Sequence, residues 1–517
     1  MSDSKKNPAV GIDLGTTYSV IAHVNETGRP ETIPNSEGDL LTPSVVLFDG
    51  DDVIVGREAA KARATELDNV ADCPKRQIGN QVYDKKFGDR RYPPEALQGW
   101  ILNKLKRDAA RMAGEFENAV ITVPAYFDEV RRKATQDSGF IGGLNVLDII
   151  NEPTAAAVAY GYREGWIDLA GKVREPINVL VYDLGGGTFD VTVMEVGQER
   201  FRAIATDGDM RLGGQDWDQR LIDHVAQNFK INFGVDPTTD STALGKLLRD
   251  CKEAKETLST RSRAQIECVF GSSAMKTEVT REEFEELTLD LLDRTDFTVR
   301  QTLKAANMNW SDIDKVLLVG GSTRMPAVRE MLTALSGKVP DTSLSPDEAV
   351  AHGAALRAAM LLNKKSSAFR PVEIKNVNSH SLGVIANEVG TGIQKVAVLI
   401  PRNTPLPVVS RRVFKTHRKD QESILVQIVE GESSNPEDCS QLGRCAIWDL
   451  PDKLAVDTKI EVKFAYAENG RLQISVLVGG DANKTFQYEI QRPNSLSKEQ
   501  LDSWREYICG PDDFQLA

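Results

Sequence analysis

Two segments of this chain follow the same plan, and this duplication limits the possible folds more than any other feature. VGIDLGTTYSVIAHV begins at Val10, and VYDLGGGTFDVTVMEV begins at Val181. Each has an apolar run, an Asp-Leu-Gly turn with small or hydroxyl residues, and a second apolar run. The two Asp residues, Asp13 and Asp183, are 170 positions apart. Because two copies are too few for a solenoid, we expect a duplicated fold that holds a ligand between its halves.

Each copy is predicted to be a β-hairpin whose turn is almost free of bulky side chains. Glycine permits backbone conformations that other residues resist, and it lets a ligand approach the main chain. Consecutive N–H groups in such a turn bind anions, and nearby hydroxyls add donors. The residues concerned are Gly15, Thr16, Thr17, Gly185, Gly186, Gly187 and Thr188. One such hairpin is more often purely structural, whereas two, each with an Asp before its glycines, favour phosphate binding.

Acidic side chains accompany these turns. Asp13 and Asp183 repel phosphate directly, so they fit better around the water shell of Mg²⁺, which is bound through few carboxylates. NEPTAAAVAYG at Asn151 predicts a helix with Glu152 at its start. Glu152 is either an ordinary helix-start acid or a carboxylate that positions water or metal.

A third glycine turn, from Gly320 to Pro326, follows the apolar run KVLLVG. It suits backbone approach to a sugar or base, and Arg324 could stack on a planar ring. Strand-end Gly-Gly is common, so this turn alone does not decide the function.

The pattern along the chain predicts an α/β region followed by a small all-β domain. Apolar strands (10–12, 119–123, 177–182, 315–320) alternate with helical patterns (96–112, 282–306) as far as Asn363. Polar KKSSAFRP follows, and then short alternating runs with an Asn469–Gly470 hairpin turn. Ser497 with Gln500 forms a capping box, and Gly510–Pro511 ends the last helix. The expected divisions are 1–363, a linker at 364–380, a β domain at 381–492, and a short helix and tail at 493–517.

Composition excludes several classes of function. The 517 residues are too many for one core, and the net charge of -13 argues against nucleic-acid or anionic-membrane partners. The six cysteines and five histidines show no zinc or disulfide pattern. The N-terminus lacks a signal-peptide pattern, so a cytoplasmic location is expected. There is no GxxxxGK[ST], HExxH or GxSxG motif.

Together these segments resemble the seventy-kilodalton heat-shock chaperones of the DnaK type. The matching strings occur in the family's order and cover residues 10 to 360 almost continuously. They are GIDLGTTYSV, KRQIG, VITVPAYF, NEPTAAAVAYG, DLGGGTFDVTV, RLGGQDWD, KEAKETLS, LLVGGSTRMP and SPDEAVAHGAA. The resemblance implies an actin-like ATPase domain with two lobes around a nucleotide cleft. SLGV, LIPRNTPLP, SILVQIVEGE and ENGRLQISV further imply a β-sandwich that binds extended unfolded peptides.

The resemblance also implies roles for individual residues around ATP or ADP. Thr16, Thr17 and Gly185 to Gly187 would grip phosphates, and Asp13, Glu152 and Asp183 would surround Mg²⁺ and its waters. Lys75 would position the attacking water, Thr188 would contact the terminal phosphate, and Tyr18 and Asp190 would help hold K⁺. The remaining nucleotide contacts would be Gly15, Gly214, Lys255, Ser259, Gly320, Gly321, Ser322, Arg324 and Asp347. Val384, Phe414 and Ile424 would form the peptide pocket, although all three could equally be sandwich core.

The chain departs from the family pattern at several places. Glu256 stands where some members have an adenine-stacking arginine, and the linker segment Val372–Asn376 is half polar. Asp148 replaces a basic residue used with J-domain co-chaperones, although Arg132 is retained. The loop after Lys75 is shorter, and only about 25 residues follow the β domain, so a helical lid is not expected.

We therefore expect an ATP-hydrolysing chaperone that binds unfolded clients, with a J-domain protein and an exchange factor as candidate partners. A nucleotide-binding holdase or regulator, and a small-molecule kinase of the same fold, are the alternatives.

Overall fold

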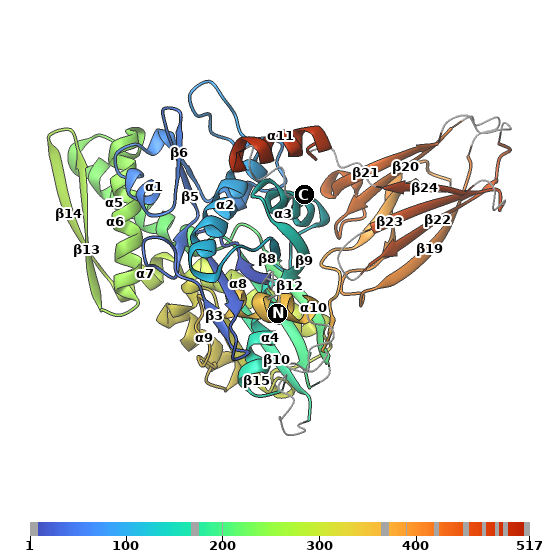
Figure 1. Cartoon of the computed structure of the whole chain (residues 1–517), viewed down its shortest axis with the longest axis horizontal. Coiled ribbons are helices and arrows are strands. Elements are labelled where there is room, and N and C mark those ends of the chain that lie inside the picture. Colours follow the sequence, from blue (N-terminus) through green and yellow to red (C-terminus); the bar gives the residue numbers. More distant parts are fainter. Residues whose placement is uncertain are drawn as a thin grey trace, which may run out of the picture.

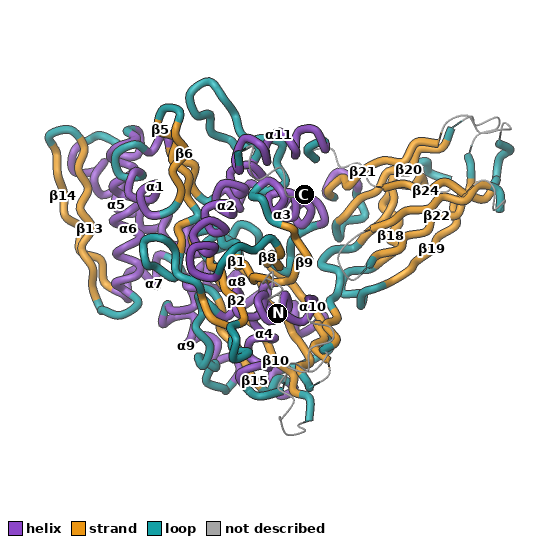
Figure 2. The backbone as a smooth tube through the Cα atoms, viewed as in Figure 1, coloured by secondary structure: helices purple, strands orange, loops and turns teal. Residues whose placement is uncertain are grey.

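The computed structural model describes residues 9–166, 175–198, 200–362, 372–388, 390–417, 423–447, 454–467, 472–480, 485–489 and 495–510. Within them the chain forms a large α/β body and a β-sandwich that extends from one side of it (Figures 1 and 2). None of the described helices is both long and apolar enough to cross a bilayer.

Two large sheets in the α/β body share the order of four strands, since β3-β2-β1-β8 in one corresponds to β12-β11-β10-β15 in the other. The first runs β3-β2-β1-β8-β9, with β4 beside β2, and the second runs β15-β10-β11-β12-β16. In each sheet an antiparallel hairpin, β1–β2 or β10–β11, has a parallel strand beside its first member and an antiparallel strand beside its second. The predicted duplication is therefore confirmed. We call the half built on β1 the first lobe and the half built on β10 the second lobe.

The strands of the first sheet are β1 (Ala9–Asp13), β2 (Tyr18–Val24), β3 (Pro30–Thr32), β4 (Thr42–Pro43), β8 (Asn118–Val123) and β9 (Asn145–Asn151). Those of the second are β10 (Ile177–Leu184), β11 (Phe189–Val196), β12 (Arg200–Asp209), β15 (Lys315–Val319) and β16 (Glu373–Lys375). The predicted strands at 10–12, 119–123, 177–182 and 315–320 all lie within or against these elements.

Two helices join the lobes. α4 (Glu152–Arg163) and α10 (Ala349–Leu362) pack against each other, α10 against β1 and β8, and α4 against β10 and β11. Both helices are rich in buried alanine, and Gly353 of α10 is in close contact with Ala155 of α4. Small side chains allow this close packing. Because each helix contacts both the other helix and the sheet of one lobe, a movement of one lobe relative to the other must change the contact between α4 and α10.

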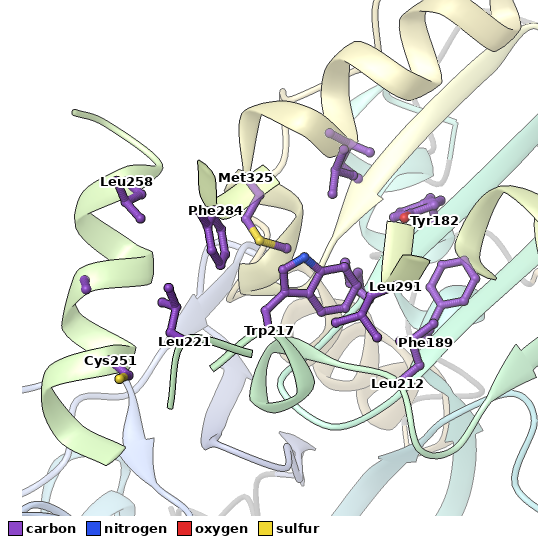
Figure 3. Close-up of a cluster of buried hydrophobic side chains, with 14 of the residues drawn as sticks. Tyr182, Phe189, Leu212, Trp217, Leu221, Cys251, Leu258, Phe284, Leu291 and Met325 are labelled. Carbon is purple, nitrogen blue, oxygen red and sulfur yellow. The ribbon is translucent and has the colours of Figure 1, made fainter. Parts of the chain in front are cut away.

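The outer parts of the lobes enclose the space above this junction. In the first lobe, β5 (Val45–Asp49), β6 (Asp52–Val55) and β7 (Val70–Asp72) form a small sheet beside α1 (Arg57–Ala62). The large helices of that lobe are α2 (Pro94–Ala113) and α3 (Glu129–Ile141). In the second lobe, the hairpin β13 (Arg263–Phe270) and β14 (Ser273–Thr280) packs on α5 (Gly214–Phe233) and α6 (Ser241–Leu258). Trp217 of α5 lies between Phe284 and Leu291 in the core of this lobe, beside Met325 (Figure 3).

The helical pattern predicted at 282–306 is confirmed, and the structure divides it into two helices. α7 (Arg281–Leu287) and α8 (Leu289–Ala305) are separated at Thr288, whose φ of -118° and ψ of 8° are not helical. The Thr288 hydroxyl donates to the Phe284 carbonyl at 2.8 Å. The Thr298 and Thr302 hydroxyls make the same kind of bond inside α8, so this bond alone does not explain the break. α9 (Pro326–Ser336) then packs against α8.

The predicted all-β region is a sandwich of two four-stranded sheets, ordered β18-β17-β20-β21 and β19-β22-β23-β24. The strands are β17 (Leu382–Asn387), β18 (Gln394–Ile400), β19 (Val408–Lys415), β20 (Ile424–Glu430), β21 (Ser440–Ile447), β22 (Lys459–Tyr466), β23 (Leu472–Val478) and β24 (Thr485–Glu489). The predicted Asn469–Gly470 turn lies outside the described residues. The strands that it was expected to join, β22 and β23, do pair antiparallel.

The sandwich and the segments that flank it contact the α/β body at several of the described places. β16, from the expected linker, pairs with β12, and Val372 and Ile374 pack against the core there despite Glu373 between them. The sandwich also contacts the loop before α3. The predicted terminal helix exists as α11 (Lys498–Cys509), capped by Ser497 and Gln500, and it lies on α2 and α3 (Figure 1). Its Trp504 contacts the rings of Tyr92 and Trp100, so this short helix has the packing that it needs.

Candidate functional site

A cavity of about 800 Å³ lies between the lobes, where the three glycine turns meet. Most of the predicted nucleotide residues line it, although they come from segments as far apart as residues 13 and 347. These are Asp13, Gly15, Thr16, Thr17, Tyr18, Lys75, Glu152, Asp183, Gly185, Gly186, Thr188, Gly214, Lys255, Ser259, Gly320, Gly321, Ser322, Arg324 and Asp347. Glu256 also lines the cavity.

The two hairpin turns face each other across this cavity at very short range. A Cβ added to Gly186 would lie 2.0 Å from the Thr17 hydroxyl, so only glycine fits there. Gly320 has a φ of 82° and leaves no room for a side chain beside Leu184. The Gly214 N–H and the Ser322 hydroxyl both donate to the Gly185 carbonyl at 2.9 Å. The third turn and the start of α5 therefore hold the second hairpin turn in place.

An ion pair sits at the bottom of the cavity among buried carboxylates. Lys75 Nζ lies 2.6 Å from Glu152 Oε1, with the two side chains only 5% and 9% exposed. Burial disfavours the Lys75 ammonium, but Glu152 and Asp13 outweigh burial and raise the pKa of Lys75. Burial, together with Glu152, raises the pKa of Asp13 to about 7 and that of Asp183 well above its ordinary 3.8. With its carboxyl groups ionised, the site would hold more negative charge than Lys75 compensates, and the raised pKa values of Asp13 and Asp183 reflect this cost together with burial.

Two predicted site residues are close to the cavity but do not line it. Gly187 lies in the turn beside Thr16, and its carbonyl accepts two hydrogen bonds from Arg76 at 3.2 Å. Asp190 lies behind Asp183 on the hairpin, and it accepts a hydrogen bond from the Tyr126 N–H at 2.9 Å. Burial raises the pKa of Asp190 to about 8. Asp190 therefore faces the loop before α3.

At the other end of the cavity, the predicted nucleoside residues are held by partners that the sequence interpretation missed. Lys255 Nζ lies 2.8 Å from Asp218 and donates to the Gly214 carbonyl at 2.7 Å. Arg324 pairs with Asp347 at 2.8 Å. Asp218, which holds Lys255, lies in the string RLGGQDWD, and Arg76, which holds Gly187, lies in the string KRQIG. Both strings carry the family resemblance, so the sequence could have indicated both residues as candidates.

The three predicted peptide residues lie in or against the core of the sandwich. Val384 of β17 and Ile424 of β20 are buried, and Phe414 of β19 is half-buried and packs against the same cluster. All three sit on strands of the sandwich that is joined to the α/β body.

The cavity with its paired glycine turns and buried lysine defines a two-lobed phosphate-binding protein with an attached β-sandwich. The family model for Hsp70 protein matches residues 9–90 and 82–507. Chaperone protein DnaK of Thermotoga neapolitana is 40% identical over 506 residues, which are 96% of this chain and 82% of that protein. Chaperone protein DnaK of Thermosipho melanesiensis is 39% identical over 507 residues, 96% and 83% of the two chains. The chain belongs to the Hsp70 family, and it is an ATP-dependent molecular chaperone and an ATPase.

Proposed function

We propose that the chain hydrolyses ATP in the cavity of an actin-like domain, residues 1–363, and that the bound nucleotide controls how tightly the sandwich, residues 381–492, holds unfolded peptide. Residues 364–380 are the linker, and 493–517 form the terminal segment. Val384, Phe414 and Ile424 form the peptide pocket, which accepts one side chain of a strand-like segment. The protein acts in the cytoplasm. The observation that carries this proposal is a series of contacts from the second hairpin, beside the cavity, through the loop before α3 to the sandwich.

Nucleotide binding rests on two sets of groups in the cavity. The backbone of the glycine turns, with Thr16, Thr17 and Thr188, holds the phosphates, and Lys75 orients the attacking water. Lys255, Ser259, Gly321, Ser322, Arg324 and Asp347 hold the nucleoside. Electrostatic positioning of this kind is the main source of catalysis in phosphoryl transfer.

The excess negative charge at the bottom of the cavity suits a bound cation. Asp13, Glu152 and Asp183 would hold Mg²⁺ mainly through its waters, since no three of the described His, Cys, Asp and Glu side chains converge on one direct metal site. When bound, Mg²⁺ would supply positive charge to the phosphates. Tyr18 and Asp190 are the candidate partners of a potassium ion.

The route from the cavity to the sandwich passes through the loop before α3. On the cavity side, Asp190 accepts the hydrogen bond from the Tyr126 N–H. On the sandwich side, the Ser379 hydroxyl donates to the Ala125 carbonyl, and His380 Nε2 lies 3.0 Å from the Tyr126 carbonyl. Arg402 also reaches this place, over the Tyr126 ring and 2.7 Å from Asp207. A nucleotide that shifts Asp190 would thereby change the docking of the sandwich, and the coupling must be reciprocal.

We expect an unfolded peptide to raise the ATPase rate, and ATP to weaken peptide binding relative to ADP. Arg402→Ala should reduce the peptide stimulation by about three-fold or more, since it removes the partly buried charged partner of Asp207 at the docking surface. The ATPase turnover of this variant without peptide should stay within about two-fold of that of the unaltered protein. Arg411→Ala, at an exposed arginine of β19, is the matched control. If neither ligand affects the other in the unaltered protein, the coupling proposal is wrong.

The docking of the sandwich on the α/β body should also depend on pH, through the side chains of Glu430 and His380. Glu430 of β20 is buried against the start of α3, where the Glu129 N–H donates to it at 3.4 Å. Burial, and then the charges of Asp128 and Glu129, raise the pKa of Glu430 well above 4.5. Docking is therefore strongest with Glu430 protonated and weakens as the pH rises through that raised pKa. Burial lowers the pKa of His380 below 6.5, so His380 weakens docking as the pH falls below 6.5.

Glu430→Gln should abolish the loss of docking on the alkaline side and leave only the loss on the acid side. Energy transfer between a dye on the sandwich and one on the first lobe would measure docking across this pH range. Glu437→Gln, at an exposed carboxylate of the sandwich, should leave the loss of docking unchanged on both the acid and the alkaline side. An alkaline loss that persists in Glu430→Gln would show that another group causes it.

Among partners, the proposal includes unfolded polypeptides, a J-domain co-chaperone and a nucleotide exchange factor. Asp148 lies 2.9 Å from Arg357 in an ion pair that joins β9 to α10. Its charge is therefore largely compensated within the chain. A J-domain partner would have to use Arg132 and neighbouring groups rather than a basic residue at position 148.

A further inference from the structure

A second cavity, of about 270 Å³, lies within the second lobe, where α7, α8 and α9 meet the end of α6. Its inner wall is apolar and buried. Trp217, Leu258, Phe284, Met325 and Val328 line it, and each of these residues is at most 5% exposed. Phe284 and Met325 lie beside the Trp217 indole (Figure 3). The cavity therefore offers aromatic and aliphatic surface to a ligand that can leave water.

This cavity is separate from the one between the lobes. The two share only Ser259 and Met325 among their lining residues. An apolar cavity of about 150 Å³ is enough to hold a benzene ring, so the larger volume here has room for a bicyclic group. Met325 and Met331 also line the cavity, and their unbranched side chains let the wall adapt to the shape of a ligand.

The rim of the cavity carries two carboxyl groups that are not balanced by a cation. Glu285 of α7 and Glu330 of α9 both line the cavity, and neither forms an ion pair within the part of the chain that the structure describes. Burial, and then the charge of Glu330, raise the pKa of Glu285. Arg281 opposes this shift without reversing it, because its guanidinium donates to the Leu258 and Arg261 carbonyls at 2.8 and 2.9 Å. The rim therefore favours a positively charged group.

The hydroxyl groups in the wall are already engaged within the protein. The Ser259 hydroxyl donates to the Lys255 carbonyl at 3.3 Å, and the Thr288 hydroxyl donates to the Phe284 carbonyl at 2.8 Å. A ligand would therefore be selected by apolar contact inside the cavity and by charge at its rim.

We propose that this cavity binds a small organic cation, with an apolar body of one or two rings against Trp217 and Phe284 and one amine between Glu285 and Glu330. Burial of the rings supplies most of the affinity, and the amine compensates the two carboxylates. An anion of the same size meets those carboxylates and is disfavoured. The site is independent of the proposed ATPase and peptide-binding activities, since its ligand occupies neither the cavity between the lobes nor the sandwich.

The test is calorimetric titration of the whole chain with 2-(2-naphthyl)ethylamine, whose bicyclic ring suits the volume of the cavity. The comparison is 3-(2-naphthyl)propionate, an anion of nearly equal bulk. The amine should bind about ten-fold or more tightly than the anion. A variant with both Glu285→Gln and Glu330→Gln should reduce this preference to about three-fold or less, because it removes both charges and keeps the side-chain shapes. Glu286→Gln, at an exposed carboxylate of α7 that does not line the cavity, is the matched control and should keep the full preference.

A second variant and a competition experiment test where the rings bind. Ala327 of α9 lines the cavity, so Ala327→Leu should fill part of it and weaken binding of the amine by about five-fold or more. Saturating ADP should leave the affinity for the amine within about three-fold, because the two cavities are separate. The proposal would be overturned by absence of amine binding, by equal binding of the amine and the anion, or by a preference that survives removal of both carboxylates. Complete displacement of the amine by ADP would also overturn it.

Discussion

Replacing Lys75 with alanine should reduce ATP hydrolysis by about 100-fold or more while ATP still binds. The lysine is buried 2.6 Å from Glu152, among carboxylates that hold excess negative charge. Removing one preorganised charged donor from such a site typically costs 10²- to 10³-fold in turnover. The phosphates are gripped mainly by backbone groups of the glycine turns, which this substitution leaves in place. ATP affinity should therefore change by less than about five-fold.

Two measurements check this result together. Single-turnover hydrolysis reports the chemical step, and calorimetric titration with ATP reports binding. Lys61→Ala, at an exposed lysine of α1 that pairs with Glu58, is the control and should be unaffected. Turnover close to that of the unaltered protein would show that Lys75 does not position the attacking water. Tight ATP binding by the unaltered protein with no hydrolysis at all would favour the nucleotide-binding holdase over the ATPase.

The second large effect is expected at the junction between the lobes, where a single added methyl group has no room. A Cβ at Gly353 of α10 would lie 1.8 Å from the Ala155 carbonyl oxygen of α4. This atom belongs to a helix backbone and cannot rotate away, so the two helices must separate along their contact. Overpacking of this kind costs about 3 kcal/mol. We expect Gly353→Ala to lower the unfolding temperature of the α/β body by about 5 °C or more.

Scanning calorimetry would measure this loss, with Gly197→Ala as the matched control. Gly197 lies in the turn between β11 and β12, where an added Cβ meets ordinary contacts at 3.4 Å. The same chemical change should therefore cost little there. Equal unfolding temperatures for the two variants would mean that α4 and α10 are not in the close contact described. Since both helices connect the lobes, Gly353→Ala should also slow the nucleotide-dependent lobe movement.

Much of the local structure followed from the sequence, because short-range chemistry decides it. The glycine turns at Gly15 and Gly185 lie in hairpins, as their residues predicted, and the Ser497–Gln500 capping box starts α11. The helical pattern at 282–306 is present, but its break at Thr288 could not be read from the sequence. The Thr298 and Thr302 hydroxyls bond to carbonyls four residues earlier, as Thr288 does, without ending α8.

The partners of the site residues could not be read in the same way. Lys75 and Glu152 are 77 positions apart, and Lys252 and Tyr18 are 234 apart. No local pattern indicates that either pair meets, and nothing in the sequence of α6 distinguishes Lys252 from Lys246 as a contact to the other lobe. Resemblance to a family could supply the first pair. It could not supply the second, which only the closed arrangement of the two lobes brings together.

The sequence by itself determined that two hairpins with glycine turns exist and that a β domain follows them. Each depends on residues adjacent in the chain, where glycine freedom, alternation and capping act within a few positions. Only the tertiary structure decided that these hairpins face each other across one cavity, that the half-polar linker pairs with β12, and that α11 packs on α2 and α3. The physical reason is that burial and charge compensation stabilise contacts between residues that are far apart in the chain. Which of these residues meet depends on how the whole chain folds and not on their neighbours in the sequence.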